Sequence, residues 1–367
     1  MKSPEKIVIF DYSGTLSPEA PRFGRRENLV RALAETGLAA FGVATPEVFW
    51  GEIVGPTWTE GSTTAAGYKS LMAEKVRGLR AAQTVPESEI AAACARFVDR
   101  YLANSRIDPQ WRPLLSRLTA IPDTCGIIAT DHYAEATEAI LGFLRAWDIP
   151  ARRMGTDPYP PPSGENWGGG SGALERGEGE ARTPSSNERE KNGDRPLLSI
   201  PGSIRSGDPS SFRGSAAEEN RGAVPIFPLF VANSADLGFW KADRRFWEML
   251  RSRLSPETVR RVLKEKGVCP RFQRILIVDD FGFNEEAGDL YGRREKVLAR
   301  QEKTAGLLRE VFHAEVEVIP FFLEGEARDS EEVWSRRIDE AAARIERFLE
   351  MTLKIDPPPH SRESGNP

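Results

Sequence analysis

The stretch Lys6-Ile-Val-Ile-Phe10, followed at once by Asp11-Tyr-Ser-Gly-Thr15, decides the fold of this 367-residue chain. Its first half is a short apolar run rich in β-branched residues, typical of a strand that is buried on both faces, and its second half is a polar turn. Two later runs have the same form: Cys125–Ala129 ends in Thr130-Asp131, and Arg274–Val278 ends in Asp279-Asp280. The three runs together predict buried parallel strands whose carboxyl ends carry polar side chains.

Helical patterns fill most of the chain between and after these strands. Apolar residues recur at helical spacing in residues 26–41, 66–82, 87–104, 110–120, 134–147, 242–253, 256–266, 294–312 and 331–352. Two further strands are expected at 226–231, where Pro228 weakens the pattern, and at 314–319. No strand pattern interrupts residues 20–105. The order predicts an α/β fold, a doubly wound (Rossmann-like) parallel sheet core with an inserted all-helical cap.

Composition divides the chain further. Residues 155–222 hold 13 Gly, 8 Pro and 10 Ser, so they cannot bury enough apolar surface to offset the entropy of ordering. We expect a disordered insertion there, and a disordered tail over 356–367. The core is then expected to comprise residues 1–18, 106–154 and 223–355, with the helical cap at 19–105.

Charge and composition exclude several classes of protein. The chain carries 50 Lys+Arg against 55 Asp+Glu, which gives no electrostatic reason to expect a nucleic-acid or membrane partner. Its three cysteines form no CxxC pair, and its three histidines are too few to favour a multi-histidine metal site. No apolar run approaches the ~20 residues of a membrane span, and the first apolar run is too short for a secretory core. We therefore expect a cytoplasmic protein with reduced thiols.

The polar strand ends indicate a site. The carboxyl ends of parallel strands meet at one edge of the sheet, which would bring Asp11, Thr130 and Asp280 together. Carboxylates that converge repel one another unless a cation neutralises them, and oxygen ligands suit Mg²⁺. The sequence therefore predicts a magnesium site.

Four motifs in order resemble those of the haloacid dehalogenase-like (HAD) superfamily. They are Ile7–Leu16 for hhhhDxDGTL, Ile127–Thr130 for an apolar strand ending in Thr or Ser, Ser234–Phe246 for S-x-x-x-G-x-x-K-P-D-x-x-F, and Ile275–Asn284 for hhhhDDxxxN. Each motif alone is weak, but the four stand in the right order at predicted strand ends and helix starts. The resemblance implies a hydrolase that acts on a small phosphorylated molecule, most often a phosphatase.

The resemblance also implies residue roles. Asp11 would be the nucleophile, since a carboxylate is already ionised at neutral pH. Thr130 and Lys241 would bind the transferring phosphoryl group. Asp11, Asp280 and the backbone carbonyl of Ser13 would bind Mg²⁺, and Asp279 would support the metal site. Gly14 and Thr15 would form a tight turn beside the phosphate. Lys241 as a surface residue and Thr130 as a helix cap are the plain alternatives.

One departure from the family pattern is Ser13, which stands where phosphatases of this superfamily usually carry an acid/base Asp. A serine hydroxyl is too weak an acid for that work, so Asp131 or His132 would serve, or the enzyme would be slow. Two other functions stay open: phosphonatase- or dehalogenase-type hydrolysis of a C–P or C–X bond, the former with Lys69 forming a Schiff base, and a weakly active member that acts as a binding protein. Trp50, Trp58 and Tyr68 of the cap could line the substrate entrance or simply pack the cap.

Overall fold

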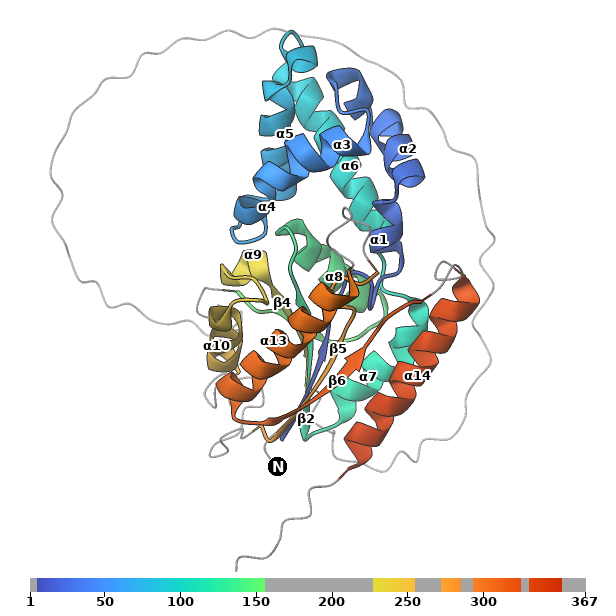
Figure 1. Ribbon diagram of the computed structural model, residues 1–367, viewed down its shortest axis with the longest axis vertical. Coiled ribbons are helices and arrows are strands. Elements are labelled where there is room, and N and C mark those ends of the chain that lie inside the picture. The colour runs from blue at the N-terminus through green and yellow to red at the C-terminus, as the bar shows by residue number, and fades with distance from the viewer. Residues whose placement is uncertain (1–4, 156–226, 255–271, 285–292, 325–329, 352–367) are drawn as a thin grey trace, which may run out of the picture. The chain divides into compact units, whose positions relative to one another are not determined.

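Six parallel strands form one sheet in the computed structural model, which describes residues 5–155, 227–254, 272–284, 293–324 and 330–351 (Figure 1). The strands are β1 (Lys6–Phe10), β2 (Thr124–Thr130), β3 (Ala151–Arg153), β4 (Leu229–Asn233), β5 (Arg274–Asp279) and β6 (Glu315–Pro320). They lie in the order β3-β4-β2-β1-β5-β6, and every neighbouring pair is parallel. β1 lies inside this parallel sheet, with β2, β4 and β3 on one side of it and β5 and β6 on the other, which confirms the predicted Rossmann-like α/β fold.

Helices cover both faces of the sheet because successive side chains of a strand point to opposite faces. Val8 and Phe10 of β1 pack in one apolar cluster, and Ile7 and Ile9 pack in another. The first cluster includes residues of α7 (Arg112–Ala120), α8 (Glu135–Ala146) and α14 (Glu331–Glu350); the second includes residues of α10 (Arg244–Arg253) and α13 (Arg294–Phe312). With both faces covered, β1 is fully buried and its carboxyl end is the part that meets the site.

Between β1 and β2 the described residues form helices only, which is compatible with the predicted insertion. These are α1 (Glu19–Phe23), α2 (Arg26–Thr36), a 3₁₀ turn (Leu38–Phe41), α3 (Pro46–Val48), a π-helix (Phe49–Val54), α4 (Gly55–Gly61), α5 (Tyr68–Gly78), a 3₁₀ turn (Arg80–Ala82) and α6 (Glu87–Asn104); a further 3₁₀ turn (Pro109–Trp111) leads into α7. Their apolar side chains build a cluster of their own, which includes Leu33, Met72 and Phe97. We call residues 19–105 the helical segment.

The expected helix over 26–41 is wrong as one continuous element. It ends at Thr36, because Gly37 takes a left-handed conformation with φ of 90° and closes the helix; a short 3₁₀ turn follows. The helix expected over 66–82 is likewise shorter, since Gly67 precedes its start and Leu79 is extended.

The strand expected over 226–231 lies later, at β4. Pro228 has no N–H to donate to a ladder, so the strand begins immediately after it. β3 was not predicted, because Ala151-Arg-Arg153 has neither an apolar run nor an alternation of apolar and polar residues. The expected helix over 256–266, and the expectations of disorder over 155–222 and 356–367, fall outside the described residues, apart from Gly155.

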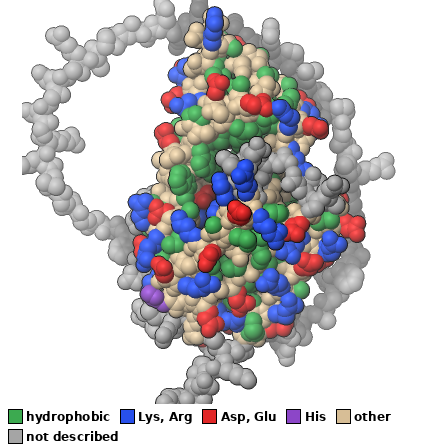
Figure 2. Space-filling view, in the orientation of Figure 1, with side chains coloured by type: hydrophobic (Ala, Val, Ile, Leu, Met, Phe, Trp, Pro, Cys, Tyr) green, Lys and Arg blue, Asp and Glu red, His purple; other side chains and the backbone are tan. Residues whose placement is uncertain are grey.

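Surface chemistry is mixed on the face drawn in Figure 2, where Lys and Arg side chains are interspersed with Asp and Glu. Among the described helices, none combines the length and apolar character needed to cross a membrane.

Candidate metal centre and active site

Three aspartates converge where β1 and β5 end. Asp11 directly follows β1, Asp279 ends β5 and Asp280 comes next; the three are 6%, 3% and 2% exposed. Phe10 lies beside Val278 in the parallel register, so the residues that follow are neighbours. One carboxylate oxygen from each aspartate lies within 4.8 Å of the others. The group could therefore hold a metal ion, as the strand order predicts.

Lys241 supplies the positive charge at this cluster. Its Nζ donates to Asp11 Oδ1 at 2.5 Å and to Asp279 Oδ2 at 3.0 Å. Its backbone N–H donates to Asp131 Oδ1 at 2.8 Å, and its carbonyl accepts from the Trp247 indole at 2.7 Å. Burial alone would lower the pKa of Lys241, but the neighbouring carboxylates outweigh it and raise that pKa well above its ordinary value.

The donor set fits a hard divalent cation. In their ionised forms, three carboxylates exceed the one ammonium of Lys241 in charge, and like charges buried together are costly without a counter-ion. The atoms of Asp11, Asp279 and Asp280 that could bind a metal are all carboxylate oxygens, which are the ligands that Mg²⁺ and Ca²⁺ prefer.

Backbone amides fix the orientation of two of these carboxylates. Gly282 N–H donates to Asp280 Oδ1 at 2.9 Å, and Asn284 N–H donates to Asp280 Oδ2 at 2.8 Å. Phe281 N–H donates to Asp279 Oδ1 at 2.6 Å, and Phe281 itself has a φ of 50°. The turn after β5 therefore points its amides back at the aspartates that precede it, as an Asx turn does.

Asn284 is a positioning residue that sequence reasoning quoted within a motif without giving it a role. Its Nδ2 donates to the carbonyls of Gly14 at 2.8 Å and Phe321 at 2.9 Å, and its Oδ1 accepts from Leu323 N–H at 3.0 Å. One buried amide thus ties the turn after β1 to the segment after β6. Its position four residues after Asp280 is the sequence signal that could have found it, and its burial makes the pairing of its donors and acceptor necessary.

Gly14 and Thr15 shape the turn after β1, as expected. Gly14 has a φ of 76°, and a Cβ added there would lie 2.6 Å from Asp280 Oδ2, so only glycine leaves room for the carboxylate. Thr15 Oγ1 accepts from Asp280 N–H at 3.1 Å, and its carbonyl accepts from the Trp111 indole at 3.2 Å. Thr15 therefore ties β1 to β5 whatever it does toward phosphate.

The structure places the other expected site residues at the same edge. Thr130 is the last residue of β2, is 2% exposed and lies beside Asn233 of β4 in the parallel register. Ser13 is half-buried in the turn after β1 and forms an isolated bridge with Ser17. Asp131, next to Thr130, joins this edge to Lys241; burial raises its pKa and the Lys241 charge opposes that rise.

His132 is held as a neutral imidazole. Its Nδ1 accepts from Tyr133 N–H at 2.9 Å, so the ring proton is on Nε2, which lies 2.7 Å from the Tyr101 hydroxyl. Its backbone N–H donates to Asn233 Oδ1 at 3.1 Å and Ser234 Oγ at 3.2 Å. Burial lowers the pKa of His132 to about 4.

A cavity of about 530 Å³ opens beside this edge. Ser13, Asp131, His132 and Tyr133 line its end at the sheet. The rest is lined by the helical segment, through Ala20, Pro21, Phe23, Gly24, Leu29, Phe49, Trp50, Val54, Gly55, Trp58, Tyr68, Phe97 and Tyr101. Trp50, Trp58 and Tyr68 thus line a cavity that also reaches Ser13.

Lys69 is placed differently from the role the phosphonatase alternative requires. Its Nζ pairs with Asp99 at 2.5 Å, its side chain is 39% exposed, and it is absent from the lining of the cavity. A Schiff-base lysine would have to reach the substrate, so this placement does not favour that reaction.

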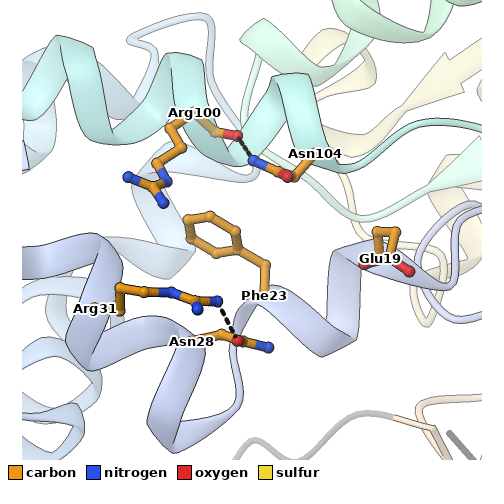
Figure 3. Close-up of a pocket in the computed structure, with 6 residues that line it drawn as sticks. All are labelled: Glu19, Phe23, Asn28, Arg31, Arg100 and Asn104. Atoms are coloured by element: carbon orange, nitrogen blue, oxygen red, sulfur yellow. Dashed lines mark hydrogen bonds between the residues drawn. The ribbon is translucent and has the colours of Figure 1, made fainter. Parts of the chain in front are cut away.

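A second cavity of about 140 Å³ lies within the helical segment and is lined by Glu19, Phe23, Asn28, Arg31, Arg100 and Asn104 (Figure 3). Its polar groups bond one another: Arg31 Nη2 donates to Asn28 Oδ1 at 2.8 Å, and Asn104 Nδ2 donates to the Arg100 carbonyl at 2.7 Å. Phe23 lines both cavities. Two further lining residues pair with groups outside the lining, Glu19 with Arg22 and Arg100 with Glu35.

Comparison with known proteins found no match to this chain among family models, curated proteins or solved structures.

Divalent metal should stabilise the folded protein through the aspartate cluster. Mg²⁺ at about 100 times its Kd should add about 2.7 kcal/mol to the free energy of unfolding, measured as a rise in the thermal midpoint. Asp280→Asn should lose this rise, because an amide oxygen is a weaker ligand than a carboxylate; the rise is compared with each protein's own metal-free midpoint, since Asn also removes one acceptor for the Gly282 and Asn284 amides. Asp148→Asn, at an exposed position, is the matched control and should keep the rise. An equal rise in wild type and Asp280→Asn would contradict the assignment.

His132 should make stability depend on pH. Its pKa is about 4 when folded and about 6.5 when unfolded, so between these values the unfolded state binds the extra proton. Lowering the pH from 6.5 toward 4 should therefore cost up to about 3 kcal/mol of stability that is fully present above pH 6.5. Urea unfolding across this range should show a shallower loss for His132→Gln; parallel profiles for the two proteins would show that His132 is not buried in its neutral form.

Proposed function

We propose that this protein is a Mg²⁺-dependent hydrolase of the HAD type that cleaves a small phosphate monoester through an aspartyl-phosphate on Asp11. The observation that carries the proposal is the buried Asp11 carboxylate, held by Lys241 and grouped with Asp279 and Asp280 at the carboxyl end of the central strand. The order of the four motifs supports it, because their residues meet at this one edge. Phosphoryl transfer depends mainly on positioning and charge neutralisation, which this set of groups offers.

In the proposed first step, an Asp11 carboxylate oxygen attacks phosphorus and the bond from phosphorus to the ester oxygen breaks. Lys241 Nζ, which donates to Asp11 Oδ1, fixes the orientation of the nucleophile and offsets the charge of the phosphoryl oxygens. The Thr130 hydroxyl, at the end of β2, would donate a hydrogen bond to an oxygen of the same phosphoryl group. Water then attacks the aspartyl-phosphate, which releases inorganic phosphate and regenerates the Asp11 carboxylate.

The proposed ion would be held by Asp11 and Asp280, with the Ser13 carbonyl, and supported by Asp279. When bound, Mg²⁺ would neutralise negative charge on the phosphate. The chain's own part is to keep the carboxylates oriented, through the amides of Gly282 and Asn284 on Asp280. Without these bonds the repulsion among the carboxylates would spread them apart.

The leaving oxygen needs a proton, and the chain lacks an Asp at position 13 to give it. Asp131 lines the same cavity as Ser13, and burial raises its pKa. His132 is less suited, because its pKa of about 4 leaves it neutral and its Nε2 proton is directed at Tyr101. We therefore propose a slow phosphatase in which Asp131 partly replaces the usual acid.

The helical segment would act as the cap that excludes water from the reaction. It is joined to the core by direct bonds: Trp240 Nε1 donates to Ser62 Oγ at 2.7 Å, and Glu135 accepts from the backbone N–H groups of Tyr68 at 2.8 Å and Lys69 at 3.0 Å. The described cysteines, Cys94 and Cys125, are buried free thiols, in keeping with the cytoplasmic setting we propose.

A panel of phosphate monoesters, assayed with and without Mg²⁺, tests the proposed function. We expect phosphate release that requires Mg²⁺ and falls at least about 10³-fold in Asp11→Asn, because the nucleophile is lost. Asp148→Asn should leave the rate unchanged. Full activity of Asp11→Asn, or full activity without divalent metal, would contradict the mechanism.

Replacement of Ser13 tests whether the missing acid limits the rate. General acid–base help is worth about 10²–10⁴-fold, so Ser13→Asp should raise kcat on the order of 10²-fold for substrates with poor leaving groups. Substrates whose leaving group needs no proton should gain much less. An unchanged kcat for both classes would show that proton transfer at this position does not limit turnover.

A further inference from the structure

The cavity beside the site has an aromatic wall. Of the residues that line it, Phe23, Phe49, Trp50, Trp58, Tyr68, Phe97, Tyr101 and Tyr133 carry aromatic rings. They come from separate helices and from the loop after β2, so the fold gathers them from positions far apart in the sequence. Cavities lined by aromatic groups with a few polar ones are the usual form of a small-molecule site.

The charges on the lining limit what the cavity can take. Among the described residues that line the cavity there is no Lys or Arg, and the one carboxyl group is that of Asp131. His132 adds no positive charge, because its ring is neutral with Nδ1 accepting a bond from Tyr133 N–H. A ligand body that carries further phosphates or carboxylates would leave its charges unpaired here, which is costly in a desolvated site.

The rings are held in place rather than loosely packed. Tyr133 stacks on Tyr68 with ring centroids 4.0 Å apart, and Trp58 meets the Tyr133 ring edge-on at 5.5 Å. A Cβ added at Gly61 would lie 2.1 Å from the Tyr133 ring, so the glycine lets the helical segment approach this closely. The Tyr133 hydroxyl lies 3.3 Å from that of Thr57. The wall is therefore formed before any ligand binds.

A π-helix supplies part of the wall. Residues Phe49–Val54 form it, and Phe49, Trp50 and Val54 of this element line the cavity. In its wide turn the Gly55 N–H bonds the Trp50 carbonyl, five residues earlier, and α4 with Pro56 near its start follows directly. Short π-helices are rare, and many lie at functional sites. This element is independent evidence that the cavity is a site and not a packing gap.

The volume of the cavity decides between the two kinds of ligand that could pack on its aromatic rings. A volume of about 530 Å³ lies within the range of about 300–1,000 Å³ that small-molecule sites occupy. A one- or two-ring aromatic body can contact several of the rings at once, by offset or edge-on packing. A small quaternary ammonium group could pack on the same rings, but it would leave most of the cavity unfilled.

We infer that the cavity binds a neutral aromatic body of one or two rings, which in the proposed function is the leaving group of an aryl phosphate monoester. Ser13, two residues after Asp11, and Asp131, which bonds the Lys241 backbone, place the inner end of the cavity next to the reacting groups. The aromatic body occupies the space among the rings, and its phosphate lies toward Asp11. The inference rests on the proposed function for the chemistry, and on the cavity alone for the binding.

Substrate preference is the first test. With Mg²⁺ present, kcat/KM for 1-naphthyl phosphate should exceed that for glycerol 3-phosphate, phosphoserine and phosphocholine by at least about 10²-fold, and that for hexafluoroisopropyl phosphate, whose alcohol leaves about as readily as naphthol but has no ring, by at least about 10-fold. Comparable values, or a preference for phosphoserine or glycerol 3-phosphate, would overturn the inference. A preference for phosphocholine would show that the rings bind a cation instead.

Trp50→Ala is the matched variant. Trp50 lines the cavity yet is 36% exposed, so its truncation should change the thermal midpoint little. It should lower the preference for 1-naphthyl phosphate about 10-fold, mainly through KM. Trp147→Ala removes the same side chain from a partly buried position outside the cavity and should leave the preference unchanged. Equal effects of the two variants would overturn the inference.

Binding of 1-naphthol, measured by calorimetry without metal, separates this inference from the proposed function. Suppose first that no ester is hydrolysed. If naphthol still binds to wild type, and about 10-fold more weakly to Trp50→Ala, the cavity is an aromatic site and only the phosphatase proposal fails. If esters are hydrolysed but naphthol does not bind, the phosphatase proposal survives and this inference fails.

Discussion

Burial of three carboxylates at one edge of a sheet is the constraint on which the rest of the site depends. Asp11, Asp279 and Asp280 are almost inaccessible to water, and the Lys241 ammonium bonds two of them, Asp11 and Asp279. Like charges so placed would drive the strand ends apart or take up protons, unless the chain supplies donors and a cation supplies charge. The geometry around them is best understood as the means of keeping them close.

Besides the Lys241 ammonium, the described donors to Asp279 and Asp280 are backbone amides of the turn that follows them. The turn after β5 directs amides of Phe281, Gly282 and Asn284 at the two aspartates before it. Because Gly14 has no Cβ, the Asp280 carboxylate can approach the turn after β1. Asn284 then locks both turns together through its side-chain amide. A substitution at Gly14 or Asn284 would therefore disturb the carboxylates without removing one of them.

Much of this could be predicted from the sequence, because strand and motif carry local signals. The continuous apolar run of Ile7, Val8, Ile9 and Phe10 and the three polar strand ends predict a parallel sheet, and parallel strands must bring their carboxyl ends to one edge. The meeting of Asp11 with the two aspartates after β5 follows from that topology alone. The pairing of Lys241 with Asp11 needed more, namely a motif resemblance, since no local pattern directs a lysine toward a strand in another part of the chain.

Other features depend on tertiary contacts or on single residues that periodicity overlooks. The break at Gly37 interrupts a helical pattern that reads as continuous, and the π-helix at Phe49–Val54 lies in a stretch for which no helix was predicted. The aromatic cavity collects rings from many elements, and the amide of Asn284 acts through backbone carbonyls that have no signature in sequence. The four-residue spacing from Asp280 to Asn284 is the one local hint of its role.

The most direct measurement of the central claim is the identification of the phosphorylated residue. Protein incubated with Mg²⁺ and 1-naphthyl phosphate, quenched in acid within a turnover and reduced with borohydride, would be digested and analysed by mass spectrometry. We predict that Asp11 is recovered as homoserine, the product of reduction of an aspartyl-phosphate, in wild type and not in Asp11→Asn. Rapid phosphate release with an unmodified Asp11, or modification of another residue, would contradict the account.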